Sequence, residues 1–396
     1  MEYKVYTPLK RHSIVVFLII ASICLCIINF FGSKPNRFIG DVTTIYNRDT
    51  SPKQVAKYQF PSIDERFEYY MGDWYNKTDW QLKRKCPTLA ADKLTNKRES
   101  VINHDMLFSL KNLKKCSDIS WYCYDAYNTL KLFKSSHSSN PLALFKFGDG
   151  YSNVASNPVI SKSRPALGRN LHTPIIWPLN TKRHFAPLQQ IWEAKMDNKE
   201  IEWKDKESKL FWRGKTTGRR VELLSRWTQY DSNVIDVAFS EIQPKHGKFL
   251  NKYLGRHDTR QTADPLEMLK YKYLLSIEGN DVASGLKWML YSNSVVLMAP
   301  PTVSTWAMED LLLPFVHYIP LADDYSNLSE MIQWAEDHQD TCQVISKRAT
   351  AFIEQLCLSK QAKIDTEILR ERMATAYVSQ FQQTLSHCNV RNGTSN

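Results

Sequence analysis

The most regular alternation of apolar and polar segments lies between residues 271 and 298. An apolar run at 271–277 is interrupted by the polar, glycine-containing segment 278–281; residues 282–291 then show helical spacing, and 294–298 form a second short apolar run. This order predicts a strand, a loop, a helix and a strand, which together make a βαβ unit. Open α/β sheets bind ligands at the carboxyl ends of such strands, where a helix N-terminus offers N–H groups to a phosphate. An ordinary crossover connection explains the same pattern.

Strand-like and helix-like segments continue to alternate elsewhere in the chain. Strand candidates are residues 141–147, 173–179, 210–214 and 234–239, and helix candidates are residues 185–205, 219–228 and most of the chain after 327. This alternation predicts an α/β protein, with a parallel sheet covered by helices on both faces. Ser326 and Asn327 are suited to cap the first of the C-terminal helices.

An uncharged apolar segment near the N-terminus, residues 13–31, is long enough to span a bilayer. The sequence that follows it lacks a small-x-small cleavage site, so we expect an uncleaved anchor; a cleaved signal peptide is the alternative. Positive residues before the span favour a cytoplasmic N-terminus. The predicted organisation is a cytoplasmic tail (1–12), a transmembrane helix (13–32), a stem (33–60), an N-terminal α/β domain (61–200) and a C-terminal α/β domain (201–396).

The 396 residues carry a net charge of +11, which suits a nucleotide diphosphate or an anionic glycan. Nucleic acid is the rival partner, but the sequence has no run of clustered Lys and Arg and no recognised nucleic-acid-binding module. Six of the eight cysteines lie outside the apolar span, an even number that permits three disulfides and is consistent with a secretory lumen. No cysteine or histidine cluster has zinc spacing, and no DxD pair follows a strand, so we predict no essential metal or cofactor.

Three blocks in a fixed order carry a family resemblance. They are LFWRGKTTGRR at 210–220, YKYLLSIEGNDVASGLKWMLYSNSVVL at 271–297 and TWAMEDLLLPFVHYIPL at 305–321. Together they resemble glycosyltransferase family 90, which includes capsule-associated proteins, protein O-glucosyltransferases and lipopolysaccharide-modifying transferases. The form EGNDVASGLKW is closer to the lipopolysaccharide-type branch. The resemblance implies a GT-B-like fold, in which two Rossmann-type domains face a cleft, and a UDP-linked sugar as donor. It also implies that the N-terminal domain (61–200) is the acceptor side and that the C-terminal domain (201–396) binds the nucleotide sugar.

Sugar transfer needs a base for the acceptor hydroxyl, and Asp149 is the candidate. It follows the strand candidate at 141–147 and lies between Gly148 and Gly150, which let a substrate approach the backbone. In the family, an Asp just past the corresponding strand is the catalytic base, although FGD stands here in place of a D-x-P type motif. A turn-forming Asp is the alternative.

The departing diphosphate and the nucleoside need contacts of their own. Arg213 can form bidentate contacts with phosphate, and Lys287 aligns with a family Arg that binds the diphosphate, although a Lys lacks the fork geometry. A carboxylate at Glu309 would accept hydrogen bonds from ribose; a helix-start Glu is the alternative. The remaining donor-side candidates are Gly214, Asp236, Gly279, Ser284 and Gly285.

Arg164, Arg183 and His184 form a basic set in the N-terminal half. They are candidates for binding an anionic acceptor or the donor phosphate, with solvated or paired side chains as the alternative. The sequence therefore predicts a membrane-anchored, inverting transferase of a glucose- or xylose-type sugar. Its acceptor would be a glycan, a lipopolysaccharide or a glycoprotein, in a Golgi or ER lumen if eukaryotic and at the inner membrane if bacterial. A catalytically silent, membrane-tethered glycan-binding protein of the same fold is the rival.

Overall fold

Five parallel strands run through the C-terminal half of the chain in the order β11-β9-β8-β6-β7. They are β6 (Glu207–Lys215), β7 (Ile235–Glu241), β8 (Tyr271–Leu275), β9 (Val295–Met298) and β11 (Ile319–Pro320). β8 and β9 are mostly apolar and almost wholly buried, as expected of strands covered by helices on both faces. Because β6 and β8 are parallel neighbours, the loops that follow them leave the same edge of the sheet.

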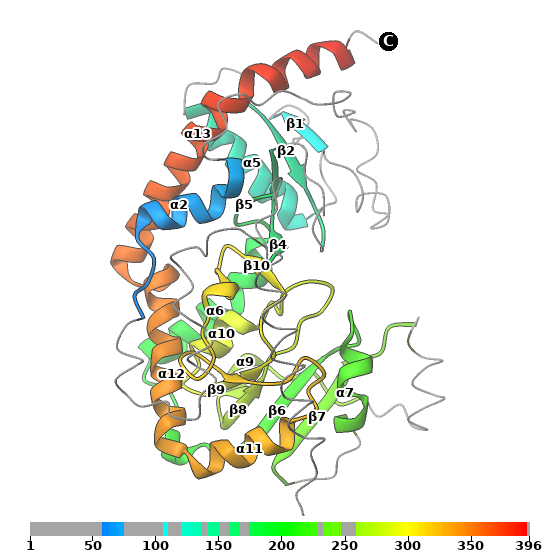
Figure 1. Cartoon of the computed structure of the whole chain (residues 1–396), viewed down its shortest axis with the longest axis vertical. Helices are drawn as coiled ribbons and strands as arrows, with labels where there is room; N and C mark the ends of the chain where they lie inside the picture. The colour runs from blue at the N-terminus through cyan, green and yellow to red at the C-terminus, as the bar shows by residue number, and fades with distance from the viewer. Residues whose placement is uncertain are drawn as a thin grey trace, which may run out of the picture. The chain divides into compact units, whose positions relative to one another are not determined.

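The computed structural model, shown in Figure 1, describes residues 58–74, 106–109, 120–135, 141–149, 158–166, 174–228, 233–244, 246 and 259–393. The predicted tail and transmembrane helix lie outside these ranges. Within them, no helix has both the length and the apolar character needed to cross a membrane.

Three helices connect the strands of this sheet. α7 (Arg220–Thr228) joins β6 to β7, α9 (Pro265–Met268) precedes β8, and α10 (Leu286–Leu290) lies between β8 and β9. The βαβ unit is therefore present, but its helix has only five residues, and the prediction that it begins at residue 282 is wrong. Residues 282–285 lie in the loop before the helix, with Gly285 at its N-cap position, and Asp281 in the same loop pairs with Lys162 at 2.7 Å.

A second sheet lies in the N-terminal half. It has the order β1-β2-β3-β5 and comprises β1 (Met106–Ser109), β2 (Leu142–Lys146), β3 (Val159–Ser161) and β5 (Ile175–Ile176). β2, β3 and β5 are parallel, and β1 is an antiparallel edge strand. β5 is shorter than predicted because prolines at 174 and 178 flank it. α2 (Ile63–Met71), α5 (Ser120–Ser135) and α6 (Thr181–Met196) complete this half.

Two features link the halves. β4 (Ser163–Pro165) pairs antiparallel with β10 (Val303–Thr305). The C-terminal helices α11 (Leu328–Asp337), α12 (Gln339–Ile353) and α13 (Lys360–Gly393) contact both sheets, with α12 against β9 and α13 against α2, α5 and β2 (Figure 1). One apolar cluster contains residues of β2, β8 and α13. The domain boundary near residue 200 stays a prediction.

Two sequence expectations about side chains differ from the structure. Asn327 lies at the N-cap position of α11, but its side chain accepts a hydrogen bond from the Ala322 N–H instead of capping the helix. Cys342 and Cys357 are free thiols, so the three-disulfide arrangement that six cysteines permit is not formed. Cys123 is disulfide-bonded.

The Tyr377 hydroxyl of α13 joins the C-terminal helix to the first sheet. It accepts a hydrogen bond from the Leu144 N–H at 3.0 Å and donates one to the Pro158 carbonyl at 3.1 Å. Tyr377→Phe would leave both buried backbone groups without this partner. We expect the free energy of unfolding to fall by ~1–3 kcal/mol, measured by urea denaturation.

Tyr124→Phe is the matched control for Tyr377→Phe, because Tyr124 is 57% exposed. It should change the stability by less than about 0.5 kcal/mol. Equal effects of the two substitutions would show that the hydroxyl of Tyr377 does not hold α13 to β2.

Candidate active site

The loops after β6 and β8 meet backbone to backbone at the carboxyl edge of the larger sheet. Gly218 has φ +57°, and a Cβ at this residue would lie 1.9 Å from the carbonyl oxygen of Gly279. A Cβ at Gly279 would lie 2.8 Å from the Thr217 hydroxyl oxygen. Only glycine permits this approach at Gly218, where both the space and the backbone conformation exclude a side chain. The predicted polar glycine loop is thus at the edge where α/β sheets bind ligands.

Arg220 supplies a fixed positive charge beneath these loops. Its guanidinium donates hydrogen bonds to the carbonyls of Lys215, Ile277 and Glu278, at 3.3, 2.8 and 3.2 Å. Burial lowers the pKa of Arg220 to about 10, with nearby Tyr325 acting in the opposite direction and Arg183 in the same one. At neutral pH the side chain remains charged, and its hydrogen bonds go to neutral groups.

A buried lysine brings the candidate base to this edge. Lys162 follows β3 and is 3% exposed; its ammonium lies 2.8 Å from Asp149 Oδ1 and 2.7 Å from Asp281 Oδ2. The amide of Asn280 donates to Asp149 Oδ2 at 3.3 Å. The predicted base after β2 and the predicted glycine loop after β8 are therefore joined by direct contacts.

The electrostatics of this cluster keep Asp149 ionised. Burial alone would raise its pKa, but the Lys162 ammonium, the hydrogen bonds from Lys162 and Asn280, and the charge of Arg183 together lower it below the ordinary value. The pKa of Lys162 is raised, because Tyr122, Asp281 and Asp149 outweigh the effect of its burial. With 29% of its side chain exposed, Asp149 remains open to an incoming group.

Lys287 and Glu309, two of the predicted donor contacts, are paired with each other. Their charged atoms are 2.7 Å apart, and the side chains are 1% and 3% exposed. Glu309 also accepts hydrogen bonds from the N–H and hydroxyl of Thr305. This pairing gives both residues a structural role, and contacts with a diphosphate or a ribose stay predictions.

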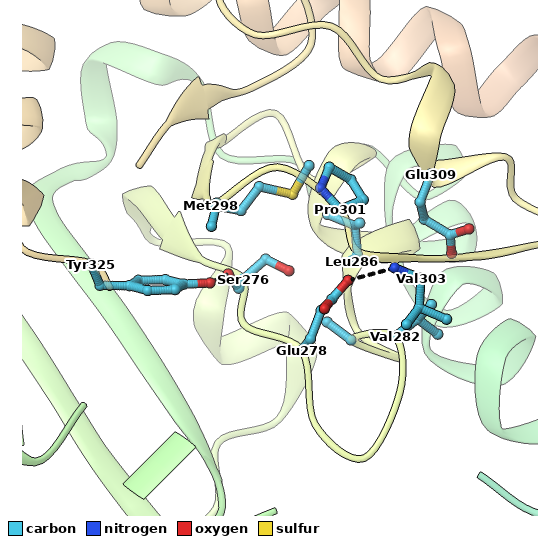
Figure 2. A pocket seen from close by; sticks show the side chains of 11 residues that line it. Ser276, Glu278, Val282, Leu286, Met298, Pro301, Val303, Glu309 and Tyr325 are labelled. Carbon is cyan, nitrogen blue, oxygen red and sulfur yellow. Dashed lines mark hydrogen bonds between the residues drawn. The ribbon is translucent and has the colours of Figure 1, made fainter. Parts of the chain in front are cut away.

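A small cavity borders Glu309. Its volume is about 20 Å³ and its lining includes Ser276, Glu278, Glu309 and Tyr325. Figure 2 shows Glu278 hydrogen-bonded to the backbone nitrogen of Val303, with Tyr325 pointing toward Ser276. The space suffices for about one water molecule and not for a nucleoside. Burial raises the pKa of Glu278, hydrogen bonds from Thr302 and Val303 oppose the shift, and the charge of Glu309 adds to it.

A larger cavity, of about 680 Å³, adjoins Arg213. Nη2 of Arg213 donates to both carboxylate oxygens of Asp236, at 2.8 and 2.9 Å, and Nη1 donates to the carbonyls of Trp212 and Asp236. The guanidinium lies 4.2 Å from the centre of the Phe211 ring, and Arg260 contacts the same carboxylate at 2.6 Å. The structure thus brings Arg213 and Asp236 together, with both terminal nitrogens of the arginine already hydrogen-bonded. A Cβ at Gly214 would clash with the Trp212 ring, so this glycine serves local packing.

Ser284 and Gly285 lie half-buried just before α10, and Gly285 occupies its N-cap position without a side-chain cap. A Cβ at Gly285 would lie 3.1 Å from Trp288 Nε1, so this glycine too has a packing role. Because α10 has only five residues, the predicted phosphate site at its N-terminus loses its basis. Donor binding by Ser284 and Gly285 stays a prediction.

The three basic candidates of the N-terminal half have different surroundings. Arg183, on α6, is exposed and close enough to Asp149 to lower its pKa. His184 is buried, neither ring nitrogen has a hydrogen-bond partner, and burial together with Lys287, Lys162 and Arg183 holds its pKa well below the usual value. Arg164 is buried over the Tyr69 ring, at 4.4 Å from its centre. Of the three, Arg183 is the exposed one beside the candidate base.

Sequence reasoning missed Lys162, Arg220 and Asp281 as individual residues. Lys162 and Arg220 lie in segments from which other residues were selected as candidates. These were Arg164 in SKSRP and Arg213 in WRGKTTGRR. A lone Lys in a polar segment is usually a solvated side chain. The burial of Lys162 could be found only from the fold.

In the part of the chain that the structure describes, no group of three or more His, Cys, Asp or Glu residues is arranged to hold a metal.

Comparison with known proteins identifies the family. The sequence profile of glycosyl transferase family 90 matches residues 179–364. The O-glucosyltransferase LpsA of Dichelobacter nodosus is 31% identical over 254 residues, which cover 63% of this chain and 69% of LpsA. The chain belongs to glycosyltransferase family 90. It is therefore a glycosyltransferase, as the three sequence blocks predicted.

The family 90 chain is 30% identical to protein O-glucosyltransferase 2 of Danio rerio over 151 residues, 38% of the chain and 29% of that protein. The crystal structure of Anabaena HepE in complex with UDP-glucose matches with a TM-score of 0.30 and 12% identity, over 46% of this chain and 52% of HepE. Asp149 and Lys162 precede the segment that the family profile matches.

The buried pair of Lys287 and Glu309 should be essential to the stability of this family 90 chain. Lys287→Met leaves the Glu309 carboxylate buried without its cation, and we expect a loss of ~3–5 kcal/mol in the free energy of unfolding. Adding Glu309→Gln to Lys287→Met should restore part of this loss, because it removes the unpaired charge. Urea denaturation of both variants measures the difference. If the double variant were no more stable than Lys287→Met, the charge pairing would not be the cause.

Proposed function

We propose that this chain transfers a sugar from a UDP-sugar to a hydroxyl group of a glycan or protein acceptor, with inversion at the anomeric carbon. The observation that carries the proposal is the contact between Asp149 and the glycine loop of the larger sheet. Asn280 of this loop donates a hydrogen bond to Asp149, and Lys162 pairs with both Asp149 and Asp281. A partly exposed carboxylate with a lowered pKa lies there beside positive charge. Family membership and the O-glucosyltransferase names of LpsA and the zebrafish relative support the same activity.

In the proposed reaction Asp149 accepts the proton of the acceptor hydroxyl. The acceptor oxygen forms a bond to the anomeric carbon while the bond from that carbon to the diphosphate oxygen breaks, and UDP leaves with the electron pair. Lys162 does not face the substrate; it holds Asp149 ionised and in place. Arg183, which is exposed, and Arg220, which is fixed by carbonyls, supply the positive charge that the leaving diphosphate requires.

The cellular setting and the domain arrangement belong to the same proposal. The segment 13–32 would anchor the chain as a type II membrane protein, and the two sheets would form a GT-B-like pair of domains. The disulfide at Cys123 supports a catalytic part in an oxidising lumen, such as the Golgi or ER of a eukaryote. In a bacterium the catalytic part would lie at the inner membrane on the cytoplasmic side, where nucleotide sugars are made. Arg183 and Arg220 would stabilise the diphosphate without a metal, so transfer should continue in EDTA.

Asp149→Asn should lower sugar transfer by about 10²–10⁴-fold, because an amide cannot accept the acceptor proton. The measurement is UDP release by the full-length chain, with UDP-Glc, UDP-Xyl, UDP-Gal and UDP-GlcNAc offered in turn, with and without EDTA. Asp197→Asn, which changes an exposed Asp paired with Lys199, should retain full activity.

The outcomes separate three conclusions. Release that survives Asp149→Asn would exclude Asp149 as the base and leave the enzyme class intact. A folded wild-type chain that releases no UDP from any of the four donors would favour the catalytically silent, glycan-binding alternative. Release that is lost in EDTA would contradict metal-independent stabilisation of the diphosphate.

Lys162→Met should shift the acidic limb of the kcat/KM–pH profile to higher pH. The folded-state pKa of Asp149 is lowered, so the base is active above that pKa and is lost as the pH falls through it. Without the ammonium, protonation of Asp149 begins at higher pH, and kcat/KM should decline earlier on acidification. Lys199→Met is the matched control, because Lys199 is an exposed lysine paired with Asp197. An unchanged acidic limb would show that Lys162 does not set the protonation of the base.

A further inference from the structure

α5 presents two exposed aromatic side chains close to the candidate base. Trp121 is 37% exposed and Tyr124 is 57% exposed. Their positions, three residues apart, place them on the same face of the helix, and their rings meet edge to face with centroids 5.8 Å apart. Large aromatic side chains left in solvent beside an enzyme site are candidates for ligand contact.

A lysine fixes one of these rings. The ammonium of Lys182, at the start of α6, lies 4.3 Å from the centre of the Trp121 ring. The start of α6 is itself held to α5, because the Asp125 carboxylate accepts hydrogen bonds from the N–H and hydroxyl of Thr181, both at 2.8 Å. This junction thus fixes the two helix segments that carry the aromatic pair and the cation relative to each other.

The same helix contacts the loop of the candidate base. Tyr122 is buried, and its hydroxyl donates a hydrogen bond to the Gly148 carbonyl, at 3.1 Å, next to Asp149. The Lys162 ammonium lies 6.0 Å from the centre of the Tyr122 ring. On the other side Lys182 precedes Arg183, whose charge acts on Asp149. The exposed aromatic pair therefore lies on the helix whose buried Tyr122 contacts the base loop.

We propose that Trp121, Tyr124 and Lys182 form an acceptor subsite for a carbohydrate, so that the acceptor of this enzyme is a glycan. The C–H face of a pyranose ring covers an aromatic ring, and the ammonium of Lys182 donates to sugar hydroxyl or carboxylate oxygens beside it. The surface of an aromatic pair with one cation is of a size to contact one or two sugar residues. This surface is much smaller than the roughly 800 Å² that each partner of a stable protein complex buries.

This inference rests on the proposed function and deepens it. A sugar bound on α5 would belong to a glycan that extends toward Asp149, because the same helix contacts the base loop and Lys182 adjoins Arg183, whose charge acts on Asp149. Removal of the aromatic pair should therefore weaken acceptor binding and leave the reaction of the donor unchanged.

The test uses the full-length chain and the double variant Trp121→Ala/Tyr124→Ala. Glycan-array binding in the presence of UDP identifies the oligosaccharide that binds wild type, and transfer to it from the active donor is then measured. We expect KM for that oligosaccharide to rise about tenfold or more, in the range found when aromatic anchors are truncated at binding sites. Hydrolysis of the UDP-sugar without acceptor should stay the same.

Two controls accompany the test. Trp121→Phe/Tyr124→Phe keeps aromatic faces and should retain most of the affinity for the oligosaccharide. Val344→Ala/Ile364→Ala removes two other exposed apolar side chains and should have no effect on it. Circular dichroism shows whether each variant is folded.

Three results would overturn the inference. The first is an equal KM for the oligosaccharide in wild type and Trp121→Ala/Tyr124→Ala. The second is that this variant is folded but loses donor hydrolysis together with acceptor binding, and the third is that the wild-type chain binds no glycan but modifies a peptide. Failure of the proposed function itself would appear differently, as the absence of UDP release by wild type with every donor.

Discussion

The arrangement of the site depends on one buried ammonium group. Lys162 is 3% exposed and lies between the carboxylates of Asp149 and Asp281, at 2.8 and 2.7 Å. A buried lysine charge that loses its partners is costly by several kcal/mol, so the folded chain must keep at least one carboxylate beside it. Asp149 comes from the loop after β2, and Asp281 comes from the loop after β8. The requirement to neutralise one lysine therefore holds the loops of the two sheets together and sets the position of the candidate base.

This constraint also explains which charges remain for a substrate. Lys162 is fully used by its two carboxylates, Lys287 by Glu309, and Arg213 by Asp236. Arg220 is held by three carbonyls, which orient the guanidinium without cancelling its charge. Together with the exposed Arg183, it places positive charge beside the glycine loop, whereas the lysine and arginine that the sequence blocks singled out are committed to internal pairs. A diphosphate is the kind of group that such cations attract.

The sequence predicted the α/β class and most strands, because those rest on local patterns of apolar residues. Strands β6 to β9 and helix α7 lie close to the predicted segments. The βαβ unit was placed correctly, but its helix is shorter than predicted, since residues 282–285 lie in the loop before it. Asp149 and the glycine loop were identified as candidates. Their contact was not predictable, because it joins residues far apart in sequence through Asn280 and through a lysine that no local pattern distinguishes from a solvated one.

The family profile matches one side of the site, and the residues of the other side precede the matched segment. The family profile begins at residue 179, and the glycine loop, Arg220 and the larger sheet all follow it. Resemblance therefore describes the side where the carboxyl ends of β6 and β8 meet. Asp149, Lys162 and the exposed aromatic pair of α5 precede the matched segment. The roles of Lys162 and of the aromatic pair therefore rest on geometry, whereas the role of Asp149 also rests on the family resemblance. The contact between Tyr122 and Gly148 provides part of that geometry, because it makes α5 a support of the base loop, and the proposed subsite lies on that same helix.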